Sequence, residues 1–240
     1  MGRTLVCAHR GVSAHFPENT LVAIEEAARI GAPMTEIDVR RTSDGHIVLM
    51  HDETVDRTTN GSGAVPNLTL EDIRRFDAGA WKGAQFAGEE VPTLADVLDL
   101  CRDSGMFLCI EIKQYDIAAD VVGLLEAHGM ADSTIVISFS FDTVCDVRQA
   151  NCCVATGWLT AQIEPARLDD MIRRVLADGI PVISALYTQV TPEVVERCRL
   201  RGITLYAWTI DDEATARTYA EMGVDVLASN RPQEIMQAIG

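Results

Sequence analysis

Short runs of β-branched and aliphatic residues alternate with longer segments of helical periodicity along the whole 240-residue chain. The strand-like runs occupy residues 4–9, 34–39, 106–113, 134–140, 153–159, 181–186, 203–209 and 224–229. Strands that are separated by helices in this way are expected to run parallel. Eight such β/α units in a chain of this length predict an α/β protein with a closed (β/α)8 TIM barrel. No glycine-rich dinucleotide-binding motif favours an open doubly wound sheet instead.

One stretch interrupts this alternation, at about residues 52–92. It contains "DRTTNGSG" and "FDAGAWKG", which are rich in turn-forming residues, and it follows the second predicted strand. The carboxyl ends of the strands form the active-site face of a barrel, so we expect this insertion to lie over the site as a small lid or subdomain. The alternative is a solvated loop without a part in chemistry. We expect residues 1–240 to form a single barrel domain that carries this insertion.

The charge of the chain restricts its partners. The sequence has 20 Lys and Arg against 36 Asp and Glu, a formal net charge of −16, which argues against nucleic-acid binding and against docking on anionic membranes. The amino-terminal sequence lacks a signal-peptide core, and no apolar run approaches membrane-spanning length. We therefore predict a cytoplasmic protein without stable membrane association. The sequence does not indicate its oligomeric state.

The seven cysteines resemble reduced core residues more than a disulfide framework or a metal site. Their number is odd, no CxxC pair occurs, and Cys7, Cys109 and Cys153 lie in apolar segments. Cys152 and Cys153 would point to opposite faces of an extended strand, which disfavours a shared metal or redox role.

Acidic residues interrupt two of the predicted strands with a spacing of two. Glu36 and Asp38 in "TEIDVR" share one face of the second strand, and Glu111 faces the same barrel interior from the third. Three buried carboxylates repel one another, whereas a hard divalent cation accepts oxygen ligands of this kind. This pattern predicts a site for Mg²⁺ or Ca²⁺. The alternative is a purely structural salt-bridge network, whose cations would be Arg10, Arg40 and Lys113.

Histidines and further cations are predicted to lie at the same mouth of the barrel. His9 and His51 both follow strand-like segments, and histidine readily gives and takes protons near neutral pH. Arg10 offers a bidentate fork to phosphate oxygens, and Lys113 supplies a point charge. Together these residues predict an acid–base pair beside a compact positive site that suits a small phosphate ester.

An ordered series of motifs now allows a comparison with a known family. The motifs are "HRG" at residues 9–11, "PENT" at 17–20, "EIDVRRTSDGHIVLMHD" at 36–52, "DRTTNGSG" at 56–63 and "EIK" at 111–113. This series resembles the glycerophosphodiester phosphodiesterase family, whose fold is a (β/α)8 barrel with an insertion after the second strand. The resemblance spans nearly the whole chain.

The resemblance implies a role for each matching residue. Glu36, Asp38 and Glu111 would hold one divalent cation, Mg²⁺ or Ca²⁺, and His9 and His51 would act as the acid–base pair. Arg10 and Lys113 would contact the phosphate, and Trp208 lies where the family commonly places an aromatic residue against the substrate. A plain core tryptophan is the alternative for Trp208. The activity implied is metal-dependent hydrolysis of glycerophosphodiesters to glycerol 3-phosphate and an alcohol.

Two positions need separate comment. Asn19 in "PENT" is expected to cap the first helix. Relatives often read Thr-Asp-x-Pro after the eighth strand, whereas this chain reads "SNRP" at residues 229–232, so the details of that loop are expected to differ.

Two other functions share parts of the same pattern. A phospholipase D-like or lysophospholipase D-like enzyme would cleave a lipid phosphodiester, but the acidic charge and the absence of an anchor speak against it. A non-catalytic barrel that only binds phosphate esters should have lost at least one acid or histidine of the set, and this chain retains them all. The sequence identifies neither the alcohol group nor the nucleophile, which is either water or the 2-hydroxyl of the substrate.

Overall fold

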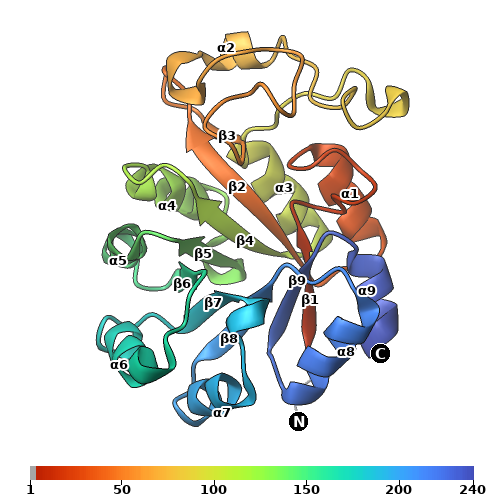
Figure 1. Cartoon of the computed structure of the whole chain (residues 1–240). Helices are drawn as coiled ribbons and strands as arrows, with labels where there is room; N and C mark the ends of the chain where they lie inside the picture. The colour runs from red at the N-terminus through yellow and green to blue at the C-terminus, as the bar shows by residue number, and fades with distance from the viewer. Residues whose placement is uncertain (1–3) are drawn as a thin grey trace.

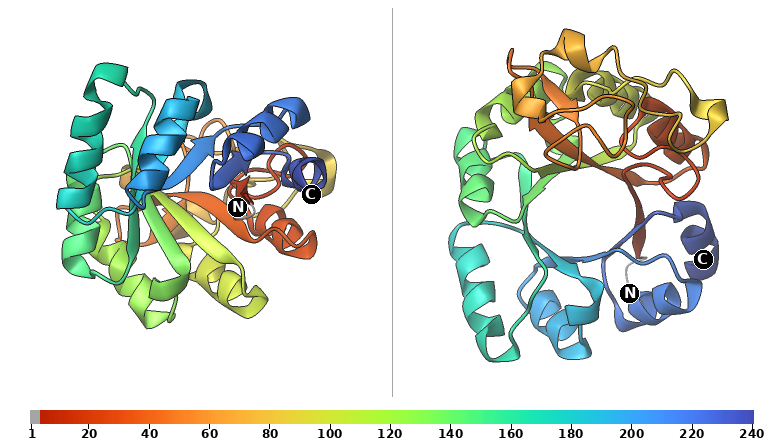
Figure 2. Two further views of the ribbon diagram at one scale, coloured as in Figure 1. Left: turned by 90° about the horizontal axis from the view of Figure 1, so that it is seen from below. Right: turned by 45° about the horizontal axis from the view of Figure 1, so that its top comes forward.

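The computed structural model describes residues 4–240 and shows a closed ring of eight parallel strands surrounded by helices (Figures 1 and 2). The ring closes because β1 pairs in parallel with both β2 and β9. The barrel strands are β1 (Leu5–His9), β2 (Met34–Arg41), β4 (Phe107–Ile112), β5 (Thr134–Ser138), β6 (Ala155–Thr160), β7 (Val182–Leu186), β8 (Thr204–Trp208) and β9 (Val226–Ser229). The predicted (β/α)8 barrel is confirmed.

Helices follow the strands in chain order and cover the outside of the ring (Figure 2). The outer helices are α1 (Leu21–Arg29), α3 (Leu94–Ser104), α4 (Ala118–Ala127), α5 (Phe141–Ala150), α6 (Leu168–Ala177), α7 (Pro192–Leu200), α8 (Glu213–Met222) and α9 (Pro232–Ile239). Three short 3-10 turns lie between these elements: η3 (Ala131–Ser133), η4 (Pro165–Arg167) and η5 (Tyr187–Gln189). Between residues 4 and 240, none of the helices combines the length and apolar character that crossing a bilayer requires.

The alternation of side chains along each strand produces two apolar layers. On β4, Leu108, Ile110 and Ile112 are buried in the layer between the strands and the helices, as predicted from the period of two. Cys109 packs with Cys7 inside the barrel. The interior of the barrel is therefore a packed core, and polar side chains enter it at the carboxyl ends of the strands.

The insertion follows a short antiparallel strand, β3 (Ile47–Leu49), which pairs with the end of β2. It continues through η1 (Val65–Asn67), α2 (Leu70–Ile73) and η2 (Ala84–Phe86). A small apolar core of its own holds it together, formed by Val48, Met50, Val55, Val65, Ile73, Ala78 and Val91. The insertion lies beyond the carboxyl end of β2, beside α1 and α3 (Figure 1).

The prediction for the cysteines is wrong at two positions. Cys7 and Cys109 are buried, but Cys153 is exposed together with Cys152, because both lie in the turn before β6. The strand begins at Ala155, two residues after the start of the predicted run. The apolar residues before Ala155 therefore made the predicted strand begin two residues too early, inside a turn.

Gly11 determines how the chain leaves β1, and it provides a first prediction. Its φ is +80°, and a Cβ atom there would lie 2.6 Å from the backbone carbonyl of Ala23. Gly31 has a similar φ of +75° but has no neighbouring atom within 4 Å of a Cβ. We expect Gly31→Ala to lower the free energy of unfolding by about 1 kcal/mol through backbone strain alone. Gly11→Ala should lower it by about 3 kcal/mol, because the collision adds to the strain. Urea unfolding of the two variants checks this, and equal losses would contradict it.

Candidate active site

Strand register brings the predicted acids together. His9 on β1 is the partner of Glu36 on β2, and Asp38 on β2 is the partner of Glu111 on β4. The three carboxylates are buried, with 3%, 0% and 8% of Glu36, Asp38 and Glu111 exposed. One oxygen of each lies within 4.8 Å of the others. The structure thus gathers the predicted ligand set at the carboxyl end of the barrel.

Two of the three predicted cations contact these acids. Lys113 Nζ lies 2.6 Å from Glu111 Oε1 and 3.2 Å from Asp38 Oδ1, and Arg10 Nε lies 3.1 Å from Asp38 Oδ2. Arg40 instead donates to the backbone carbonyl of His51, at 3.0 Å from Nη2. Of the ion pairs that the salt-bridge alternative requires, those of Arg10 and Lys113 are present and that of Arg40 is not, because the turn after β3 places a carbonyl group in front of its guanidinium.

These surroundings shift the ionisation of each acid differently. Burial opposes ionisation of Asp38, but Arg10 and Lys113 outweigh it and lower its pKa to about 2. Burial and the neighbouring Asp38 charge raise the pKa of Glu111 to about 7. The same two causes raise the pKa of Glu36 well above its usual value. Two cations are therefore too few to keep three carboxylates ionised at neutral pH.

The site fits a divalent cation on these grounds. All donors are carboxylate oxygens, which suit Mg²⁺ or Ca²⁺. Asp38 Oδ1 is buried and accepts no hydrogen bond, although Lys113 lies at ion-pair distance. A fully buried carboxylate oxygen without a hydrogen bond is a free ligand position. Within residues 4–240, this is the one cluster of its kind that could hold a metal ion.

Cation binding should be detectable by its effect on stability. Because the pKa of Glu111 is raised in the folded state, its contribution to stability is complete below its ordinary pKa of 4.5 and is lost as the pH rises through about 7. Glu36 acts in the same direction. A bound cation replaces the missing protons, so we expect Mg²⁺ or Ca²⁺ at 100 times its Kd to raise Tm by roughly 5–10 °C at pH 8.

At pH 5 the rise should be much smaller, because protons compete for the same oxygens. Thermal unfolding at the two pH values, with and without the cation, measures the difference. An equal rise at both pH values, or an undiminished rise in Glu111→Gln, would contradict binding at this cluster.

Both predicted histidines line the pocket that contains the acids. The pocket has a volume of about 200 Å³, and His9, His51, Glu36, Glu111 and Lys113 all contribute to it. Burial and the nearby Arg10 charge lower the pKa of His9 to about 4, so this ring is neutral at pH 7. Its Nε2 atom lies 3.9 Å from Glu36 Oε2. A neutral imidazole facing the acids can accept a proton there.

His51 has a different setting from His9. Its Nδ1 atom lies 2.6 Å from Asp52 Oδ1, and one third of its side chain is exposed. The carboxylate orients the ring through Nδ1, so that Nε2 is the ring nitrogen that remains to give or take a proton. Arg57 is the main cause of the lowered pKa of Asp52, which keeps this partner ionised.

The opposite wall of the pocket is mainly apolar. Its side chains come from β5 to β9 and the loops after them: Ile137, Phe139, Leu159, Ser184, Tyr206, Trp208, Thr209 and Ala228. Trp208 packs edge-on against Phe139, with ring centroids 5.9 Å apart. Its indole Nε1 is buried and has no hydrogen-bond partner among the described residues.

Several residues of the site were missed or misassigned from the sequence. Asn19 was expected to cap α1, but that prediction is wrong: Thr20 holds the N-cap position. Asn19 adopts a left-handed conformation with φ of +57° and donates from Nδ2 to Asp38 Oδ2 at 2.8 Å. Its Oδ1 atom accepts from the Asp38 backbone N–H. Asparagine tolerates this conformation better than most residues, so Asn19 fixes the orientation of the central acid.

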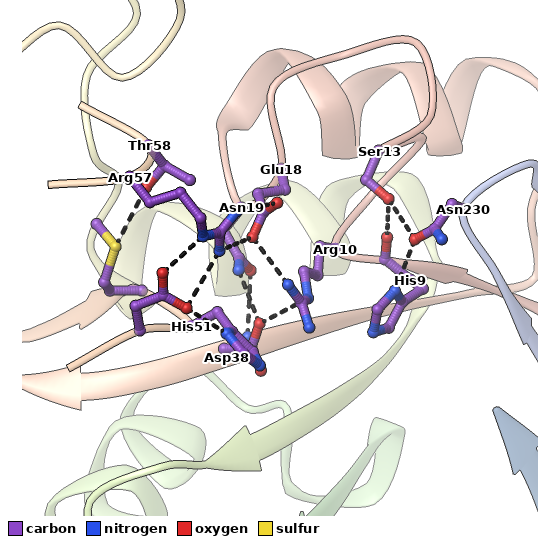
Figure 3. Close-up of polar contacts among 12 residues, drawn as sticks. His9, Arg10, Ser13, Glu18, Asn19, Asp38, His51, Arg57, Thr58 and Asn230 are labelled. Carbon is purple, nitrogen blue, oxygen red and sulfur yellow. Dashed lines mark hydrogen bonds and ion pairs between the residues drawn. The ribbon is translucent and has the colours of Figure 1, made fainter. Parts of the chain in front are cut away.

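A series of alternating charges connects the two sides of the site (Figure 3). It runs, in order, through His51, Asp52, Arg57, Glu18, Arg10 and Asp38. Arg57 comes from the insertion and donates to both oxygens of Glu18 at 2.9 and 2.8 Å. The motifs "DRTTNGSG" and "PENT" contain Arg57 and Glu18, but only the tertiary structure shows that these two side chains form an ion pair.

The insertion flanks the pocket and does not cover it. Its Arg57 reaches the charge series, and Lys82 Nζ donates to the backbone carbonyl of Ser13 at 2.7 Å. The described pocket lining nevertheless includes His51 and no residue of 52–92. Of the two forms that were expected, a small lid or a subdomain, the insertion has that of a subdomain with its own core at the rim of the barrel.

Comparisons with known proteins match nearly the whole chain. A model described as the glycerophosphoryl diester phosphodiesterase family matches residues 9–234. A glycerophosphodiester phosphodiesterase of Caldanaerobacter subterraneus subsp. tengcongensis is 36% identical over 244 residues, which cover 99% of this chain and 98% of the relative. One of Bacillus subtilis is 31% identical over 248 residues, covering 96% of this chain and 84% of the relative.

Solved structures agree as well. A phosphodiesterase of Oleispira antarctica, in complex with the product sn-glycerol-3-phosphate, has a TM-score of 0.91 at 28% identity and covers 99% of this chain and 97% of its own. A glycerophosphodiester phosphodiesterase of Agrobacterium tumefaciens has a TM-score of 0.86 at 30% identity, covering 98% and 99%. The fold and these matches define a phosphoric diester hydrolase. The chain belongs to the glycerophosphoryl diester phosphodiesterase family.

Proposed function

We propose that this protein hydrolyses glycerophosphodiesters to glycerol 3-phosphate and an alcohol, with one Mg²⁺ or Ca²⁺ ion held by Glu36, Asp38 and Glu111. The observation that carries the proposal is a cluster of three buried carboxylates, of which Glu36 and Glu111 line the same pocket as both histidines. The product complex of the Oleispira antarctica relative supports the substrate class. When bound, the cation would supply Lewis-acid stabilisation of the negative charge on the phosphate.

The side chains of this chain would divide the remaining work. Arg10 and Lys113 contact the non-bridging phosphate oxygens and offset the charge that develops in the transition state. One histidine, His9 or His51, removes a proton from the nucleophile, and the other protonates the departing alcohol. The nucleophile is water, or the 2-hydroxyl of the substrate by way of a cyclic phosphate, and both routes end in the same products.

Trp208 is proposed to contact the organic part of the substrate. Its ring and Phe139 form an apolar wall opposite the acids, against which the carbon skeleton of a small alcohol such as glycerol can pack. A single-domain organisation, a cytoplasmic location and the absence of nucleic-acid and stable membrane partners remain predictions from the sequence.

The assay that tests the proposed function is a panel of diesters. We expect glycerol 3-phosphate release from glycerophosphocholine, glycerophosphoethanolamine and glycerophosphoglycerol in the presence of Mg²⁺ or Ca²⁺. Lysophosphatidylcholine should be hydrolysed at least about tenfold less efficiently in kcat/KM, because the small pocket offers little apolar surface for an acyl chain. A preference for lysophosphatidylcholine would favour the lysophospholipase D-like alternative, which the curated relatives do not favour.

A further inference from the structure

Asp211, which follows β8, makes hydrogen bonds that fix the side-chain amide of Asn230. Its Oδ1 atom accepts from the Asn230 backbone N–H at 2.7 Å and from Ser229 Oγ at 3.0 Å. Its Oδ2 atom accepts from Asn230 Nδ2, also at 2.7 Å. A carboxylate oxygen can only accept in such contacts, so the amide nitrogen of Asn230, and not its oxygen, must face Asp211.

The opposite side of the same amide faces His9. Asn230 Oδ1 lies 2.7 Å from His9 Nδ1 (Figure 3). Because an amide oxygen has no proton to give, Nδ1 must carry the hydrogen of this bond. In the neutral ring the other nitrogen, Nε2, is then unprotonated, and this is the atom that faces Glu36. Asp211 thus determines the tautomer of His9 through Asn230.

Two further contacts hold Asn230 against the loop after β1. Its backbone carbonyl accepts from the Ala14 N–H at 2.9 Å. The Ser13 hydroxyl lies 2.8 Å from Asn230 Oδ1 and 2.6 Å from the His9 carbonyl, and its single proton serves one of these acceptors at a time. Both contacts help to hold the Asn230 side chain beside His9 Nδ1.

We propose that Asp211 and Asn230 are positioning residues that hold His9 in the Nδ1–H tautomer, so that Nε2 can take a proton from the nucleophile. This inference rests on the proposed phosphodiesterase function and assigns the role of base to His9. It also accounts for the position at which "SNRP" departs from the family pattern. A carboxylate at 211 and an amide at 230 form one complementary pair, and the donor and acceptor roles toward His9 depend on both members.

The pair can be tested by exchanging its members. In Asp211→Asn, the introduced amide keeps its oxygen on the Asn230 backbone N–H and turns its nitrogen toward Asn230. The Asn230 amide must then rotate and present its own nitrogen to His9, which favours the tautomer with the proton on Nε2. In Asn230→Asp, two carboxylate oxygens face each other at the position of a 2.7 Å hydrogen bond. The double variant Asp211→Asn/Asn230→Asp restores one donor and one acceptor at that contact.

We expect each single variant to lower kcat for glycerophosphodiester hydrolysis by about 10- to 100-fold with little change in KM, a size typical of residues that orient a functional side chain. The double variant should recover to within about threefold of the wild type, and nitrogen NMR of the His9 ring should show Nε2 protonated only in Asp211→Asn. Asp212→Asn is the matched control, since Asp212 caps α8 through Thr215 and does not touch Asn230.

The outcomes separate this inference from the proposed function. If the wild type is active and the single variants stay active, the positioning role alone is overturned. The same holds if the losses of kcat in the two single variants simply add up in the double variant. A wild type that releases no glycerol 3-phosphate would remove the proposed function, and the NMR comparison would still decide whether Asp211 sets the His9 tautomer. A proton found on Nε2 in the wild type would overturn the inference directly.

Discussion

Replacing Glu111 by glutamine is expected to lower kcat for glycerophosphodiester hydrolysis by about 10³-fold or more. The substitution keeps the shape of the side chain but removes one of three negative ligands, and it leaves Lys113 with Asp38 as its remaining carboxylate partner. Metal-assisted stabilisation of a phosphoryl transition state contributes several kcal/mol, and about 4 kcal/mol corresponds to this factor. Dialysis against EDTA should abolish activity to a similar degree, and adding back Mg²⁺ or Ca²⁺ should restore it.

The matched control is Glu164→Gln, which removes the charge of an exposed glutamate whose ion pair is with Arg167. It should retain wild-type kcat and the wild-type response to EDTA. The metal content of each preparation is measured in parallel, since a tightly retained ion resists chelation. Full activity of a metal-free preparation in excess EDTA would contradict the cation site and leave the cluster as a salt-bridge network of Arg10 and Lys113.

Removing either histidine should also have a large effect. We expect His9→Ala and His51→Ala each to lower kcat by roughly 10²- to 10⁴-fold with the fold intact, the usual size of an acid or base contribution. His46→Ala is the control, because more than half of that side chain is exposed and it lies outside the pocket lining. Circular dichroism and Tm confirm that the variants are folded. Near-wild-type turnover of both pocket variants would remove the acid–base assignment.

A change of leaving group identifies which histidine is the acid. A 4-nitrophenyl diester needs little protonation of its departing oxygen, so the variant that lacks the acid should lose much less activity on this substrate. If His9 is the base, as its tautomer implies, His51→Ala recovers on the nitrophenyl substrate and His9→Ala does not. The reverse pattern would exchange the two roles.

The sequence was most informative where a local pattern determines the structure. Strand runs alternating with helical segments predicted the barrel, because the period of each element depends on near neighbours in the chain. The same period of two placed Glu36, Asp38 and Glu111 on the inner face, and strand register then brought them together. The acid cluster therefore required only one assumption beyond local periodicity, that adjacent strands pair.

The remaining parts of the site depend on contacts between distant segments, which no local pattern encodes. Asn19 resembles a helix cap in sequence, yet its left-handed backbone turns the side chain toward Asp38. Arg57 meets Glu18 only because the insertion docks on the rim of the barrel. The direction in which an insertion folds depends on its own small core, and the sequence alone did not indicate it.

The residues that line the two walls of the pocket come from two successive parts of the chain. Every charged lining residue lies between His9 and Lys113, and every lining residue of the facing wall lies between Ile137 and Ala228. The groups proposed for the reaction chemistry and for alcohol recognition thus come from consecutive stretches of the chain, with α4 between them, and Asp211 and Asn230 are the proposed exception because Asn230, held by Asp211, contacts His9 from the second stretch. Evolution, or a designer of chimeras, can alter which alcohol is accepted by exchanging the carboxyl-terminal half of the barrel, provided that the Asp211 and Asn230 pair is kept while the acids and Lys113 stay in place.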